Sequence, residues 1–107
     1  MDGADRLARL KERYHASLPD KSIELKDKWQ AVNASGFAPA ALMELSGYIH
    51  KFAGSTGMYG YHALAKSARR LEEDLRNPLP EDVSWQGRVA QQVQFLLRAL
   101  DNPQQIT

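Results

Sequence analysis

The chain has 107 residues, of which 43% are hydrophobic and 25% are charged, and its formal net charge is +1. This length and composition predict a single folded domain, residues 1–107, and argue against disorder. The small net charge gives no broad electrostatic footprint for nucleic acid, so no nucleic-acid partner is expected. Cysteine is absent, which excludes disulfides and thiolate chemistry.

Membrane attachment and secretion are not expected either. No apolar run approaches the roughly 18 residues that a membrane-spanning helix needs. The N-terminal stretch MDGADRLARLKERYH is charged throughout, unlike a secretory signal. We therefore expect a cytoplasmic monomer with no membrane partner.

The first two predicted helices are separated by the sequence SLPDK. Leu7, Leu10 and Tyr14 recur at three- and four-residue steps between charged residues, which predicts an amphipathic helix over about residues 4–16. Pro19 suits the first turn of the next helix, since its missing N–H has no partner there in any case. That second helix is predicted to end in the sequence NASGF.

A third helix is predicted over residues 39–58, and its only charged residues are Glu44 and Lys51. Such low charge indicates that it packs against several neighbours. A fourth helix runs to about Arg76 and is stopped by NPLPED, because proline cannot continue a helix. Ser84 is the expected N-cap of a fifth. The sequence thus predicts an all-α fold, an antiparallel four-helix bundle with an additional N-terminal helix.

The third predicted helix combines a histidine with glycines. At about 100° per residue, Gly47, Gly54 and Gly57 lie within roughly 60° of the direction of His50. The predicted buried stripe points elsewhere and consists of Leu42, Leu45, Ile49, Phe52 and Thr56. Each interior glycine destabilises a helix by about 0.5–1 kcal/mol relative to alanine. Two explanations account for these glycines. They give a bulky partner close access to an exposed imidazole, or they let a neighbouring helix pack closely.

Other site chemistries find little support in the sequence. His15 and His62 are most simply surface residues, and no H-x-x-x-H metal spacing occurs. The sequence also contains no G-x-x-x-x-G-K-[ST] phosphate loop and no acidic cluster for magnesium. The chain is therefore expected to hold no cofactor and to have no autokinase activity.

The segment HKFAGSTGMYGYHALAKSARRLEEDL, residues 50–75, resembles the histidine-containing phosphotransfer (HPt) domains of bacterial and fungal phosphorelays. It covers about a quarter of the 107 residues. The fold of that family is a four-helix bundle, often with an extra N-terminal helix. The positions that carry the resemblance are His50, Gly54, Ser55, Gly57, Gly60, Leu64 and the pair Leu71-Glu72.

The resemblance implies a phosphorelay intermediate. His50 would accept a phosphoryl group from a receiver-domain aspartate and pass it to another receiver. The implied partners are response-regulator receiver domains and a hybrid sensor kinase, and Mg²⁺ is expected only in the receiver. An exposed imidazole is mostly neutral near pH 7 and is a nucleophile without a general base.

The resemblance also assigns supporting roles around the histidine. Gly54, Ser55 and Gly57 are implied as phosphate-stabilising or access positions. Many family members carry lysine three residues after the histidine, where this chain has Ala53. Lys51 is the expected substitute. Further cations on the following helix, which are equally explained as solvated surface charge, are Lys66, Arg69 and Arg70.

A docking surface for the partner is expected around the glycines. Its candidates are Met43, Gly47 and Met58. Methionine adapts to several partners, and Met43 is equally explained as packing against the neighbouring helix. The alternative function is a non-catalytic helical adaptor of the same fold that binds receiver or kinase domains. The absence of lysine at Ala53 is the feature in its favour.

Overall fold

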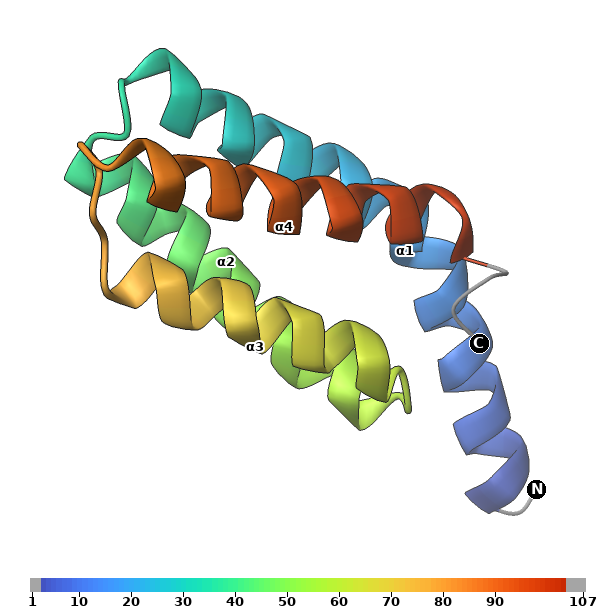
Figure 1. Cartoon of the computed structure of the whole chain (residues 1–107). Helices are drawn as coiled ribbons and strands as arrows, with labels where there is room; N and C mark the ends of the chain where they lie inside the picture. The colour runs from blue at the N-terminus through green and yellow to red at the C-terminus, as the bar shows by residue number, and fades with distance from the viewer. Residues whose placement is uncertain (1–2, 104–107) are drawn as a thin grey trace.

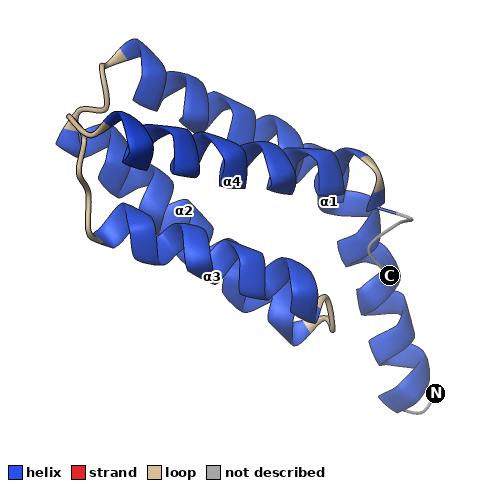
Figure 2. Cartoon of the chain, in the orientation of Figure 1, coloured by secondary structure: helices blue, strands red, loops and turns tan. Residues whose placement is uncertain are grey.

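The computed structural model describes residues 3–103, and in this part of the chain all regular secondary structure is helical (Figures 1 and 2). Each helix packs against the helices before and after it, and α1 also packs against α4. The four helices therefore close into a bundle around one core. They are α1 (Gly3–Ala34), α2 (Pro39–Met58), α3 (His62–Arg76) and α4 (Val83–Asp101).

The predicted separate N-terminal helix is wrong, because α1 continues through Pro19. A proline inside a helix removes one backbone hydrogen bond and crowds the preceding turn, at a cost of about 3 kcal/mol. Burial on both sides of the proline offsets this cost. Leu18 and Ser22 are 0% and 1% exposed, and the Ser22 hydroxyl donates to Asp101 Oδ1 over 2.7 Å.

Pro19 bends α1 rather than ending it. Figure 1 shows that α1 changes direction in its N-terminal half, so that its first turns leave the bundle. Proline is the usual cause of a sharp kink in a helix, and Pro19 is the proline inside α1.

The core is built from one apolar stripe of each helix. In α2 the stripe predicted from the sequence is confirmed, since all five of its residues are buried. The largest side chains of the core have almost no exposed surface. Among them are Leu18, Leu25, Leu45, Ile49, Leu71, Trp85 and Leu96.

The turn between α1 and α2 uses a left-handed backbone at two consecutive residues. Gly36 has φ of 67° and Phe37 has φ of 62°. Glycine adopts this region freely, whereas phenylalanine does so at a steric cost. The Phe37 ring offsets that cost by packing edge-on against Trp29 and Trp85, with centroid distances of 5.9 and 6.0 Å.

The N-cap of α4 differs from the prediction. The capping side chain is Asp82, whose Oδ1 accepts hydrogen bonds from the backbone N–H groups of Ser84 at 2.8 Å and Trp85 at 3.3 Å. Ser84 lies inside the helix, so its predicted capping role is wrong. Asp and Ser are similarly good N-caps, and composition alone does not choose between them.

We expect Asp82→Ala to lower the free energy of unfolding by about 0.5–2 kcal/mol, because two amides at the start of α4 lose their acceptor. Urea denaturation followed by far-UV circular dichroism measures the change. Ser84→Ala is the matched control and should change stability by less than about 0.5 kcal/mol. Equal losses in the two variants would contradict the cap assignment.

Candidate functional site

His50 lies in the middle of α2, on the flank that faces α3. Its side chain is 65% exposed, whereas its neighbours Ile49 and Phe52 are 0% and 4% exposed. The predicted exposure of the imidazole is therefore confirmed. The buried neighbours fix the backbone beneath the ring, so the ring is held on a rigid element.

The imidazole is oriented by a carboxylate on α3. His50 Nδ1 lies 2.9 Å from Glu72 Oε2. A carboxylate can only accept, so Nδ1 carries the proton and donates it. In the neutral ring this leaves the lone pair on Nε2. The contact joins residues 22 positions apart and depends on how α2 and α3 are aligned.

Glu72 binds a second partner with the same oxygen. Glu72 is 8% exposed, and Arg76 Nη2 lies 2.6 Å from Glu72 Oε2. Burying a carboxylate is costly unless it is paired and hydrogen-bonded, and here the imidazole and the guanidinium share that task. Arg76 follows Glu72 by one helical turn. Its own side chain is 62% exposed, so the guanidinium is accessible from solvent.

Neither Glu72 nor Arg76 is assigned to the site from the sequence. Glu72 was noted as part of the Leu71-Glu72 pair, without a contact assigned to it, and Arg76 was noted only as the end of a helix. The four-residue spacing of Glu72 and Arg76 is the signal that points to their ion pair. No sequence signal places them beside His50.

Within residues 3–103, no hydrogen bond or ion pair joins Lys51, Lys66, Arg69 or Arg70 to His50 or Glu72. Lys51 is exposed and lines a shallow hollow on the α1 side of α2, together with Lys28 and Tyr48. Arg69 points toward Gly57, since its Nη2 lies 3.5 Å from where a Cβ on that glycine would be. Arg70 lines a hollow between α3 and α4.

Ser55 does not join the site. Its hydroxyl forms a 2.7 Å hydrogen bond with the hydroxyl of Tyr14 on α1 and donates to the carbonyl of Phe52. Burial raises the pKa of Tyr14, so that hydroxyl stays protonated near neutral pH. Ser55 therefore ties α2 to α1, and the phosphate-stabilising or access role implied for it gains no support.

The glycines of α2 divide into two groups. A Cβ built on Gly47 or Gly54 meets nothing within 4 Å, so both positions face open space. A Cβ on Gly57 would lie 3.6 Å from Ala65 Cβ, which makes Gly57 part of the α2–α3 contact. Close helix packing thus explains Gly57, and the open patch comprises Gly47 and Gly54.

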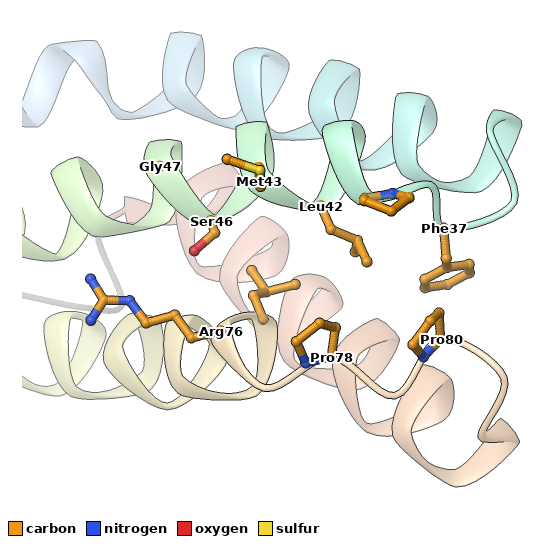
Figure 3. Close-up of a pocket in the computed structure, with 10 residues that line it drawn as sticks. Phe37, Leu42, Met43, Ser46, Gly47, Arg76, Pro78 and Pro80 are labelled. Carbon is orange, nitrogen blue, oxygen red and sulfur yellow. The ribbon is translucent and has the colours of Figure 1, made fainter.

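Exposed methionines and an apolar hollow extend the open patch. Met43 and Met58 are 75% and 74% exposed. A hollow of about 450 Å³ lies beside Gly47, and Figure 3 shows it between α2 and the chain that follows α3. Its lining is mostly apolar and comprises Phe37, Pro39, Leu42, Met43, Ser46, Gly47, Leu75, Arg76, Pro78 and Pro80.

Residues 3–103 contain no group of three or more His, Asp or Glu side chains placed to hold a metal ion. None of the helices in this described part of the chain is long and apolar enough to cross a membrane. Comparison of the chain with family models, with curated proteins and with solved structures finds no match.

We expect ¹⁵N NMR of the neutral His50 ring to show a protonated Nδ1 and an unprotonated Nε2, because Glu72 accepts from Nδ1. In Glu72→Ala the ring should move to the tautomer mixture of a free imidazole, since the acceptor is gone. Glu73→Ala, at the exposed neighbouring position, should leave the spectrum unchanged. An unprotonated Nδ1 in the wild-type protein would contradict the assigned tautomer.

Proposed function

We propose that this chain is a phosphorelay intermediate of the HPt class. His50 accepts a phosphoryl group from an aspartate of one receiver domain and passes it to a second. The observation that carries the proposal is the exposed imidazole of His50, whose Nδ1 is held by Glu72 so that Nε2 is free. The resemblance of residues 50–75 to HPt domains supplies the reaction class.

The transfer step needs only the imidazole of this chain as nucleophile. The Nε2 lone pair attacks the phosphorus of an aspartyl phosphate, the bond between phosphorus and the aspartate oxygen breaks, and its electron pair stays on the aspartate carboxylate. The imidazole becomes positively charged and keeps its proton on Nδ1. Glu72 stabilises that charge through a charge-assisted hydrogen bond. Attack by a second receiver's aspartate reverses the step.

Charge on the phosphoryl group has to be neutralised, because phosphoryl transfer depends on positioning and electrostatics. Ala53 is 2% exposed, so the position that carries lysine in many HPt domains is occupied here by a buried methyl group. We assign the neutralising role to Arg76, whose guanidinium already contacts the carboxylate that holds the ring. The Mg²⁺ that assists the reaction belongs to the receiver.

The receiver would dock on the open side of α2. Gly47 and Gly54 carry no side chain that would block a partner's active site from closing over His50. Met43 and Met58 provide adaptable apolar contacts on either side. The hollow beside Gly47 can seat an apolar side chain of the receiver. A small apolar centre with a charged rim suits a transient complex.

We expect His50→Gln to abolish phosphate acceptance, because the amide lacks a nucleophilic nitrogen. The measurement incubates the purified chain with a radiolabelled phospho-receiver and looks for acid-labile, alkali-stable label on His50. His62→Gln, at an exposed position on α3, should retain full labelling. His50→Gln should lower the free energy of unfolding by no more than about 1 kcal/mol, because one hydrogen bond to Glu72 is lost while Arg76 still pairs with that carboxylate.

Two results would count against the carrier. Full labelling of His50→Gln would show that a residue other than His50 accepts the phosphoryl group. A wild-type chain that binds the phospho-receiver without becoming labelled would favour the adaptor function.

We expect Gly54→Leu to slow transfer from the receiver roughly 100-fold, because a side chain beside His50 holds the reacting atoms apart. Its fold should be intact, since a Cβ at this position meets nothing within 4 Å. Gly87→Leu is the matched control, because Gly87 lies in α4 with equally open surroundings. Unchanged transfer in Gly54→Leu would rule out docking over this glycine.

A further inference from the structure

We propose that the N-terminal part of α1, residues 3–13, is a docking surface for an acidic amphipathic helix of another protein. We call this segment the arm. The proposal concerns a surface separate from His50 and does not depend on phosphoryl transfer.

The arm lies outside the bundle core. The first buried residue of α1 is Tyr14, and Figure 1 shows the N-terminal turns of α1 extending away from the other helices. A lone helix shorter than about 12–15 residues is marginally stable in water, because packing supplies most helix stability. The arm is continuous with the rest of α1, but its residues 3–13 are all exposed, so a partner that packed on it would add to its stability.

The apolar stripe of the bundle continues along the arm without a partner. Leu7 and Leu10 are 55% and 40% exposed. They precede Tyr14 at helical spacing and share its side of the helix. Tyr14 packs on Tyr59 with a ring centroid distance of 4.4 Å, so the stripe starts in the core and runs out into solvent.

Basic residues border the exposed leucines. At about 100° per residue, Arg6 and Arg13 flank the stripe on one side and Lys11 flanks it on the other. None of these three cations forms an ion pair with another described residue. The acidic residues of the arm, Asp5 and Glu12, fall on the opposite side of the helix. The rim of the apolar stripe is therefore positive.

This charge pattern indicates which kind of partner can bind the arm. A second copy of the arm would bring basic rims together in either orientation, which disfavours pairing. An anionic membrane calls for a larger apolar face than two leucines provide. A helix with apolar residues at three- and four-residue steps and with acidic flanks matches both the stripe and its rim.

The arm and the His50 face are spatially distinct. Lys11 Nζ lies 3.7 Å from where a Cβ on Gly60 would be, which places the base of the arm at the α2–α3 turn. His50 lies two turns of α2 before that end. Met58 lies beside that turn, whereas His50 and Gly47 lie farther along α2, so variants of the arm leucines and of His50 test the two surfaces separately.

The test measures binding of the full chain to a synthetic helical peptide of about 18 residues with leucine at a and d and glutamate at e and g. Fluorescence anisotropy should show binding that weakens as salt rises from about 50 to about 300 mM. The paired Leu7→Ser and Leu10→Ser changes should weaken it at least about tenfold by removing the apolar anchors. Val83→Ser, at another exposed apolar residue, should leave it unchanged.

Charge reversal provides a second test. The paired Arg6→Glu and Arg13→Glu changes should abolish binding of the acidic peptide and create binding to the same peptide with lysine in place of glutamate. Circular dichroism checks that each variant remains helical.

The proposal is overturned if the acidic peptide binds no better than the basic one. Two further results would also overturn it: arm-dependent binding to vesicles of phosphatidylcholine and phosphatidylserine in the absence of peptide binding, or an arm-dependent dimer in sedimentation.

Discussion

The hydrogen bond between His50 Nδ1 and Glu72 Oε2 is the interaction on which the candidate site depends. It fixes which nitrogen of the ring has a lone pair, and it directs that nitrogen away from α3. The same oxygen binds Arg76, so one buried carboxylate positions an imidazole and a guanidinium together. If Glu72 were neutral or absent, the ring would lose its preferred tautomer and the guanidinium its anchor.

This pairing requires α2 and α3 to be held in one alignment. Small residues allow the two helices to approach closely near their connecting turn, where Gly57 faces Ala65. Buried leucines on both helices, Leu45 and Leu71, fix the alignment from the core side. The exposed side of α2 has no such task, which is why Gly47 and Gly54 can remain open there. The imidazole of His50 therefore has rigid support beneath it and open space beside it, as the proposed transfer would require.

Local pattern was sufficient to predict the all-α fold, the buried stripe of α2 and the exposure of His50. Predictions from local pattern were wrong where two local rules compete. Pro19 was taken as a helix start, but burial of Leu18 and Ser22 carries α1 through it. The pattern predicts Ser84 as the cap of α4, but the capping side chain is Asp82, two residues earlier. The contacts that Glu72 makes with His50 and Arg76 could not be predicted from the sequence, because they place His50 and Glu72 on two helices whose relative register no local pattern indicates. The resemblance to HPt domains implies a role for Ser55 beside His50, yet the Ser55 hydroxyl bonds to Tyr14 on α1.

The kink at Pro19 has a geometric consequence for whatever the arm contacts. Residues 3–13 form a rod of about 16 Å at 1.5 Å per residue. Its direction is fixed by the residues between it and Pro19, because Tyr14 and Leu18 are buried. Swinging the rod about Pro19 would separate Tyr14 from Tyr59 and Ser55. The proline thus sets the angle at which the arm leaves the bundle, and Tyr14 and Leu18 hold that angle.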